Sequence, residues 1–218
     1  MKKQATGIDL IIFDLDGTLT DSIPPAITAI QEMLRELGLP HKTAEEMKPH
    51  VGYGEIPLLT GAIGSSDPAL LKKAFEIYER NYLARGIRTI PLYPHVREFL
   101  EAFRDKPKVI ISNKKYDFIM EILKNHGLTG YFEEVYGGDT SPCLKPDPCL
   151  INDIVAKRKI DKRKVLLVGD MTVDIETGKN AGVLTCAVSY GFDGRSKLEM
   201  LKPDIIVDDL MELTDLIK

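Results

Sequence analysis

Short runs of consecutive apolar residues recur along the chain and constrain its fold more than any other feature of the sequence. They cover residues 10–13, 109–111, 165–168, 184–188 and 205–207. Because several of them are apolar at consecutive positions, they favour strands covered on both faces over strands with one face in water. Most are followed by glycine or polar residues, which is typical of strands that end in loops.

Patterns with helical spacing separate these runs. Their apolar positions are Val96, Phe99, Leu100 and Phe103; Ile119, Ile122 and Leu123; Leu150, Ile151, Ile154 and Val155; and Leu210, Leu213, Leu216 and Ile217. Strands that alternate with helices are joined by right-handed crossovers and form parallel sheets. The sequence therefore predicts an α/β fold with a doubly wound, mostly parallel, Rossmann-like sheet.

The alternation breaks once, between the first apolar run and the second, where the pattern is helical only. One stripe begins after Pro24 and Pro25 and ends at Gly38, and a second begins after Asp67 and is expected to end at Gly86. We therefore predict a helical cap of residues 21–88 inserted into an α/β core of residues 1–20 and 89–218. Gly86, Pro91 and Pro94 lie on the return connection, where a hinge is expected.

Composition narrows the class of protein. The chain has 218 residues, 44% of them hydrophobic, and a net charge of −4, so it is expected to be globular and is a poor candidate for binding nucleic acid. No apolar stretch approaches the roughly 20 residues that span a bilayer. The three cysteines, Cys143, Cys149 and Cys186, contain no C-x-x-C pair and predict neither a disulfide framework nor a zinc site. We expect a cytoplasmic protein without a membrane partner, either a monomer or a homodimer.

Acidic residues follow two of the predicted strands. Asp14-Leu15-Asp16-Gly17-Thr18 ends the first run, and Gly169-Asp170 ends a later one, with Asp174 four residues on. If these strands are neighbours, the four carboxylates converge at one edge of the sheet, where open parallel sheets bind ligands. Two carboxylates about 4 Å apart repel by roughly 4 kcal/mol at an effective dielectric of 20, so the cluster needs a cation. Oxygen ligands of this kind suit Mg²⁺.

A cluster of carboxylates with Mg²⁺ suits phosphoryl transfer, because that transition state is stabilised mainly by positioning and electrostatics. Asp14 is the candidate nucleophile, which would form an aspartyl-phosphate. Asp16 is the candidate general acid and base, and Gly17 permits the bend that would turn it toward the same point. Lys145 and the strand-end residues Ser112 and Asn113 add a positive charge and polar donors.

The chain resembles the haloacid dehalogenase-like hydrolase superfamily. The resemblance rests on Asp14-Leu15-Asp16-Gly17-Thr18, Ser112-Asn113, Lys145-Pro146 and Gly169-Asp170-x-x-x-Asp174, which match the four motifs of that superfamily in order and spacing. Residues 51–54, 137–140 and 174–182 are similar to its phosphoglycolate phosphatase branch. Asn113-Lys114-Lys115 departs from the Asn-Lys-Pro that is often found at the second motif.

The resemblance implies a role for each matching residue. Asp14 would be the nucleophile, Asp16 the general acid and base, and Lys145 a catalytic cation that also binds phosphate. Mg²⁺ would be held by Asp14, the Asp16 backbone carbonyl and Asp170, with Asp174 acting through water or by orienting Lys145. The expected contacts to phosphate or substrate come from Gly17, Thr18, Ser112, Asn113 and, in the cap, Tyr53. Tyr78 and Tyr82 are interpreted as packing residues.

The implied activity is Mg²⁺-dependent hydrolysis of a small phosphomonoester, with 2-phosphoglycolate the best single candidate. A dehalogenase is disfavoured because such enzymes lack the second aspartate, which is Asp16 here. A phosphomutase or a pyrophosphatase of the same superfamily stays open. From another class, a phospho-accepting signalling module also gathers acids and a lysine at a sheet edge, but such modules are about half as long and have no helical insert.

Overall fold

A single parallel sheet of six strands forms the centre of the computed structural model, which describes residues 7–217. The strands are β1 (Leu10–Phe13), β2 (Lys108–Ile111), β3 (Glu134–Tyr136), β4 (Val165–Gly169), β5 (Leu184–Val188) and β6 (Ile205–Val207). Their order across the sheet is β3-β2-β1-β4-β5-β6, and every neighbouring pair is parallel. The predicted doubly wound α/β fold is confirmed.

Strand β1 lies at the middle of this sheet and is buried on both faces. Ile11 and Phe13 belong to one apolar cluster, whereas Leu10 and Ile12 belong to another on the opposite face. Successive side chains of a strand point to opposite faces, so a strand covered on both sides needs apolar residues at every position. Phe13 pairs with Val168, which makes β1 and β4 neighbours as their acidic ends require.

Helices cover both faces of the sheet and also extend beyond one end of it. The helices of four or more residues are α1 (Ile23–Glu36), α2 (Ala44–Met47), α3 (Glu55–Ile63), α4 (Pro68–Asn81), α6 (Val96–Ala102), α7 (Tyr116–Asn125), α8 (Cys149–Arg158), α9 (Thr172–Ala181) and α10 (Gly194–Met200). A π-helical turn, Tyr82–Gly86, joins α4 to the short α5 (Ile87–Thr89), and the chain ends in a 3-10 helix, Leu210–Asp215.

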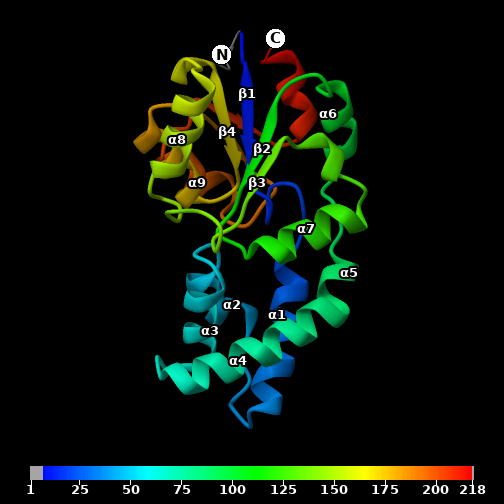
Figure 1. The fold of residues 1–218 in the computed structure, drawn as a ribbon. Coiled ribbons are helices and arrows are strands. Elements are labelled where there is room, and N and C mark those ends of the chain that lie inside the picture. Colours follow the sequence, from blue (N-terminus) through cyan, green and yellow to red (C-terminus); the bar gives the residue numbers. More distant parts are fainter. Residues whose placement is uncertain (1–6, 218) are drawn as a thin grey trace.

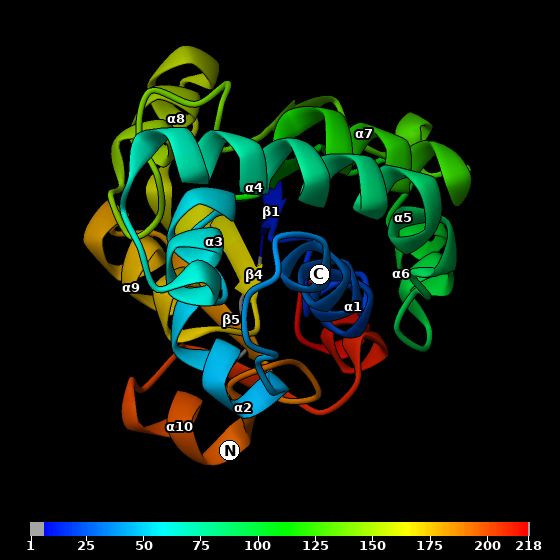
Figure 2. The same cartoon turned by 90° about the horizontal axis from the view of Figure 1, so that it is seen from below.

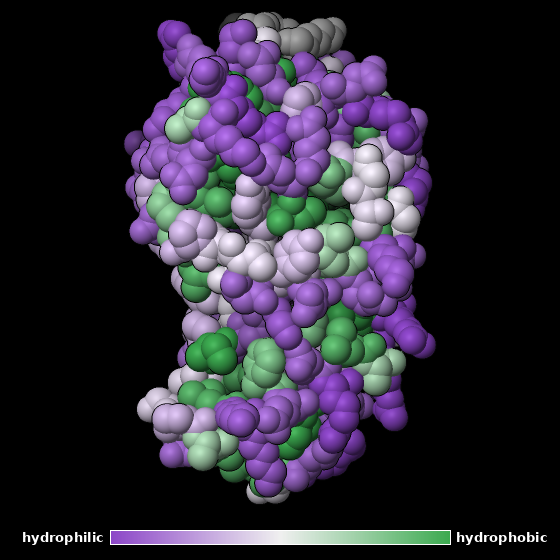
Figure 3. All heavy atoms as spheres, in the orientation of Figure 1, coloured by the Kyte–Doolittle hydropathy of each residue, from purple (hydrophilic) through white to green (hydrophobic). Residues whose placement is uncertain are grey.

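Figure 1 shows how these helices are placed. Helices α8 and α9 lie on one side of the sheet and α6 and α7 on the other, while α1 to α5 gather below it, at the end where the strands terminate. Both labelled chain ends lie at the opposite end of the molecule. Seen from below, α4 crosses in front of the sheet and α1 is viewed nearly end-on (Figure 2). The surface narrows between the two groups of elements (Figure 3).

The connections to and from the lower helices run side by side. The Asp21 amide donates to the Pro91 carbonyl at 3.0 Å, and the Tyr93 amide donates to the Leu19 carbonyl at 3.1 Å. Thr20 and Leu92 form an antiparallel bridge between these hydrogen bonds. The helical segment therefore leaves and rejoins the sheet at one place.

The structure differs from the sequence-based expectations at three elements. The edge strand β3 was not predicted, because it has only three residues and begins with the charged Glu134. The second helix does not end at Gly86 but continues to Thr89. A Cβ at Gly86 would lie 2.6 Å from the Tyr82 ring, so this glycine makes room for packing and does not end the helix. The C-terminal stripe forms a 3-10 helix.

The expectation of no disulfide is wrong for one pair of cysteines. Cys143 and Cys149 are disulfide-bonded and bracket the loop that contains Lys145, whereas Cys186 is buried and forms no disulfide. The two cysteines are six residues apart in sequence and do not form a C-x-x-C pair, so the sequence did not indicate that they are bonded. Among residues 7–217, no helix is long and apolar enough to cross a bilayer.

Candidate active site

Three buried carboxylates meet at the edge where β1 and β4 end. Asp14 directly follows β1, Asp170 directly follows β4, and Asp174 lies in the first turn of α9. One carboxylate oxygen from each of the three residues lies within 4.8 Å of those from the other two. The convergence follows from the parallel pairing of β1 with β4, since neighbouring parallel strands deliver their loops to the same edge.

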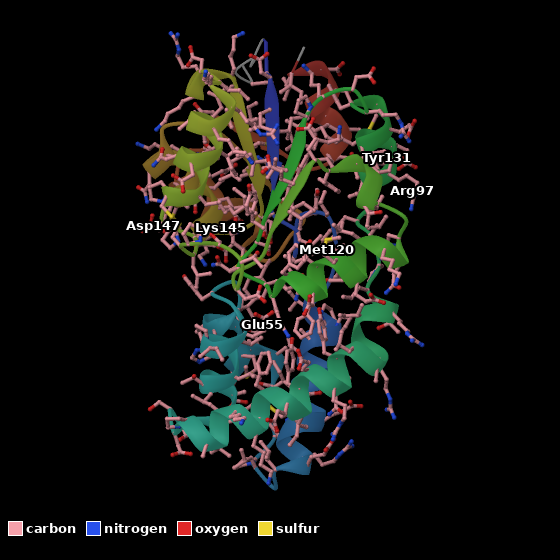
Figure 4. All side chains as sticks on the ribbon, viewed as in Figure 1. Glu55, Arg97, Met120, Tyr131, Lys145 and Asp147 are labelled. Carbon is pink, nitrogen blue, oxygen red and sulfur yellow. A yellow bond between two sulfur atoms is a disulfide. The ribbon has the colours of Figure 1, made fainter. Side chains whose placement is uncertain are left out.

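Lys145 is the cation at the centre of this cluster. Its Nζ donates to Asp14 Oδ1 at 2.7 Å and to Asp174 Oδ1 at 2.6 Å. Figure 4 labels Lys145 in the loop beneath the sheet, above Glu55 of α3. Burial opposes the charge on the ammonium, but the two carboxylates outweigh it and raise the pKa of Lys145 above its usual value. The lysine therefore keeps its proton at neutral pH.

The carboxylates carry more negative charge than one lysine can balance. Burial raises the pKa of Asp14 to about 7, against the attraction of Lys145 and with repulsion from Asp174. Burial, together with Asp174 and Asp14, also raises the pKa of Asp170 well above its ordinary value. A nearby cation stabilises the ionised form of buried carboxylates such as Asp14 and Asp170. The donor set of three buried carboxylates fits a hard divalent cation such as Mg²⁺.

Hydrogen bonds hold Asp170 and Asp174 in place. Thr18 Oγ1 donates to Asp170 Oδ1 at 2.9 Å, and the Phe192 amide donates to Asp170 Oδ2 at 2.7 Å. The Met171 amide donates to Asp174 Oδ2 at 3.0 Å, so both oxygens of Asp174 have partners. Gly17 has a φ of +85°, and a Cβ there would lie 2.1 Å from Asp170 Oδ2. Only glycine fits at position 17, where the first motif packs against Asp170.

Asp16 lies in different surroundings from Asp14. It is half-buried, accepts a hydrogen bond from the Ser22 hydroxyl at Oδ1, and has the Lys114 ammonium 3.1 Å from Oδ2. Asp14 is instead paired with Lys145. Two carboxylates two residues apart in sequence thus have separate partners, an arrangement suited to separate chemical roles.

The loop after β2 contributes Ser112 and Asn113, and both are buried. Ser112 lines the same cavity as Asp14. The Asn113 side chain is turned to the backbone of Lys145: Oδ1 accepts from the Lys145 amide at 2.9 Å, and Nδ2 donates to the Lys145 carbonyl at 3.1 Å. Nδ2 also donates to the Gly52 carbonyl at 2.9 Å. Asn113 therefore joins the Lys145 loop to the helical segment.

Lys114 is a site residue that the sequence reasoning missed. It is buried, and its Nζ contacts Asp16 Oδ2 and donates to the Tyr82 hydroxyl, each at 3.1 Å. Burial opposes its charge, but Asp16 and then Tyr82 outweigh burial and raise the pKa of Lys114 well above its usual value. Its position directly after Ser112-Asn113 was the available signal. Tyr82 packs as expected, stacked on Tyr78, and its hydroxyl adds a polar contact.

A cavity of about 60 Å³ lies between these loops and the helices below them. Its polar lining includes Asp14, Asp16, Ser112, Lys114 and Lys145, and its apolar lining comes from Ile23, Ala26, Ile27, Ile30, Leu58 and Tyr78. Glu55, half-buried at the start of α3, also lines it and accepts from the Lys115 amide at 3.0 Å. Tyr53 is 43% exposed and lines a separate outer cavity, so the structure does not bring it to Asp14.

The fold and the site together define an enzyme of the hydrolase class, with a buried carboxylate–lysine centre at the end of a parallel sheet. Residues 11–188 match the family model described as haloacid dehalogenase-like hydrolase. The chain belongs to this family.

Curated relatives and solved structures agree with the family match. The chain is 35% identical to the phosphoglycolate phosphatase of Vibrio parahaemolyticus over 219 residues, covering 96% of each chain. It is 34% identical to the phosphoglycolate phosphatase of Pseudomonas syringae pv. tomato, covering 94% of this chain and 78% of the relative. A crystal structure described as a predicted phosphoglycolate phosphatase from Haemophilus somnus superposes with a TM-score of 0.89 at 27% identity, covering 95% and 97% of the two chains.

Proposed function

We propose that this chain is a Mg²⁺-dependent phosphatase that hydrolyses 2-phosphoglycolate through an aspartyl-phosphate on Asp14. The observation that carries the proposal is the meeting of Asp14, Asp170 and Asp174 around Lys145 at the edge of the sheet. The choice of substrate is supported by the names of the curated relatives and by the size of the cavity. A cavity of about 60 Å³ suits a small leaving group, since one water alone needs about 10–15 Å³.

Asp14, the Asp16 backbone carbonyl and Asp170 are the proposed ligands of Mg²⁺, with Asp174 beside them. When bound, the ion would supply positive charge to the carboxylates and to the phosphoryl oxygens. Asp174 has both oxygens occupied by Lys145 and the Met171 amide, which supports a role in orienting Lys145. Ser112 is the proposed contact to phosphate, whereas the backbone amides of Gly17 and Thr18 already donate to the Thr20 and Leu15 carbonyls.

In the first step, a carboxylate oxygen of Asp14 attacks phosphorus and the bond to the ester oxygen breaks. Asp16 gives its proton to the departing oxygen, so the alcohol leaves neutral. The Lys145 ammonium balances charge on the phosphoryl group and on Asp14. The products of this step are the free alcohol and phosphorylated Asp14.

In the second step, Asp16 acts as a base because it has lost its proton in the first. It takes a proton from water, whose oxygen attacks phosphorus as the bond to Asp14 breaks. Inorganic phosphate leaves, and both aspartates return to their starting states. The contacts of Asp16 with Ser22 and Lys114 keep its carboxylate at the cavity while it serves both steps.

We also propose that residues 21–88 act as a cap that closes over the site. The Asn113 bond to Gly52, the Glu55 bond to the Lys115 amide and the ion pair between Lys115 and Glu79 at 2.5 Å tie this segment to the core. The paired connections at Asp21–Pro91 and Leu19–Tyr93 are the proposed hinge. A cap of this kind excludes water from the first step and admits it for the second.

The test is phosphate release from 2-phosphoglycolate by the purified protein. We expect activity with Mg²⁺, none with a chelator, and a loss of about a thousandfold or more in Asp14→Asn. The exposed Asp105 offers a matched control, and Asp105→Asn is expected to keep full activity. Full activity of Asp14→Asn would refute the mechanism. Isomerised sugar phosphate or preferential pyrophosphate cleavage would instead favour the phosphomutase or pyrophosphatase alternative.

A further inference from the structure

The cavity contains an unequal distribution of charge. Lys145 and Lys114 are the only cations among the described residues that line it. Lys145 is bound to Asp14 and Asp174, at the end of the cavity where phosphate would react. Lys114 lies beside Asp16, the proposed proton donor to the leaving group. A negative group on the leaving side of a substrate would therefore find one cation that is not already part of the carboxylate cluster at Asp14.

Lys114 has the capacity to bind such a group. An ammonium has three N–H donors. One of them donates to the Tyr82 hydroxyl, the ammonium forms an ion pair with Asp16 Oδ2, and no other hydrogen-bond acceptor contacts it among residues 7–217. The side chain is only 7% exposed, so water competes little for the remaining donor. Charge-assisted hydrogen bonds in such buried places are among the strongest in proteins.

Apart from the two lysines, Ser112 and Asn113, the side-chain donors of described residues that line the cavity are the hydroxyls of Tyr78 and Ser22, and Ser22 donates to Asp16. Helix α1 presents Ile23, Ala26, Ile27 and Ile30, and α3 presents Leu58, none of which has a side-chain donor. The two oxygens of Glu55 accept from the Lys115 amide at 3.0 and 3.2 Å. The Lys114 ammonium also lies over the Tyr82 ring, 4.9 Å from the ring centre. Elements on both sides of the cavity thus keep the ammonium at this one place.

We infer that Lys114 is the residue that selects substrates with a carboxylate on the leaving group, by binding that carboxylate with its free N–H. This inference rests on the proposed phosphatase function and names the substrate class of the same site: phosphomonoesters of small hydroxy acids. Lys114 touches the part of the substrate that does not react, so its removal should penalise acidic substrates and spare neutral ones of the same size.

Two esters of matched size separate this role from a general one. In 2-phosphoglycolate the ester carbon bears a carboxylate, whereas in ethyl phosphate it bears a methyl group. We expect Lys114→Met to lower the ratio of kcat/KM for 2-phosphoglycolate to that for ethyl phosphate by about 10- to 100-fold, the range for losing a hydrogen bond to a charged group. The melting temperature of each variant checks that it is folded.

Lys115→Met is the matched control. This neighbouring lysine is paired with Glu79 and lines the outer cavity, so its removal should change the ratio less than about threefold. An equal loss of kcat/KM for both esters in Lys114→Met would show that Lys114 acts only through Asp16 and would overturn the inference. Wild-type protein that hydrolyses both esters equally well would overturn it too. Wild-type protein that hydrolyses neither ester with Mg²⁺ would instead refute the proposed function on which the inference rests.

Discussion

At the scale of single residues, the site is organised by which partner each charged group has. Asp14 shares Lys145 with Asp174, while Asp16 has Ser22 and Lys114. Burial raises the pKa of Asp14 to about 7 even beside Lys145, so near neutral pH it exists in both protonation states when no divalent cation is bound. The same burial that disfavours its charge makes the carboxylate a strong ligand once a divalent cation is bound.

Proton competition should therefore govern the affinity for Mg²⁺. The raised pKa values of Asp14 and Asp170 mean that protons must leave before the ion binds, so affinity should rise with pH. Below the Asp14 pKa of about 7, the dissociation constant for Mg²⁺ should rise about tenfold for each pH unit that the pH falls, for each proton that the ion displaces. Titration calorimetry between about pH 6 and pH 8 measures this. In Asp14→Asn the dependence should be weaker, and an affinity independent of pH in the wild type would contradict the assignment of these ligands.

At the scale of elements, loops at the ends of strands carry the site and contact one another through side chain to backbone hydrogen bonds. Asn113, after β2, binds the backbone of Lys145 from the loop before α8 and of Gly52 from the segment before α3. Gly52 has a φ of +91°, and a Cβ there would lie 2.6 Å from Met171 Sδ. A side chain at this position would displace the end of Met171, and the positive φ favours glycine.

Substitution of Gly52 by alanine should keep the cap from closing fully. We expect Gly52→Ala to lower kcat/KM for 2-phosphoglycolate about tenfold or more, because the loop and the buried end of Met171 must shift apart, which weakens the Asn113 contact. Gly64→Ala is the control, since Gly64 also has positive φ, +67°, but an added Cβ there meets no atom within 4 Å. Both changes add backbone strain of about 1–2 kcal/mol. Equal kcat/KM in the two variants would refute a role for Gly52 in closure.

At the scale of the whole molecule, the sequence predicted the sheet and the acidic cluster because both depend on local patterns. Consecutive apolar residues in Leu10–Phe13 and Val165–Gly169 required burial on both faces, which places these strands inside the sheet. Asp14 lies beside Asp170 because these two interior strands also pair with each other. The short edge strand Glu134–Tyr136 has half-buried residues and a charged start, so its pattern was too weak to detect.

Features that depend on contacts between distant segments were not predictable in the same way. Lys114 reads as an ordinary solvated lysine until Tyr82 and Asp16 enclose it. Gly86 reads as a helix end until the Tyr82 ring is seen to occupy the space of its missing Cβ. The pairing of Cys143 with Cys149 depends on how the Lys145 loop turns. In each case the tertiary packing, and not the local pattern, decides the role of the residue.

The central claim is that Asp14 accepts the phosphoryl group, and trapping that group tests it most directly. In Asp16→Asn with Mg²⁺ and p-nitrophenyl phosphate, whose leaving group needs no proton, the first step should proceed while the second, which needs a base, should stall. After an acid quench, mass spectrometry of the peptide that contains Asp14 should show the added mass of one phosphoryl group, and the double variant Asp14→Asn, Asp16→Asn should show none. If the wild type hydrolyses this ester but Asp14 in the Asp16→Asn variant stays unmodified, the account is contradicted. A phosphoryl group on another residue would contradict it too.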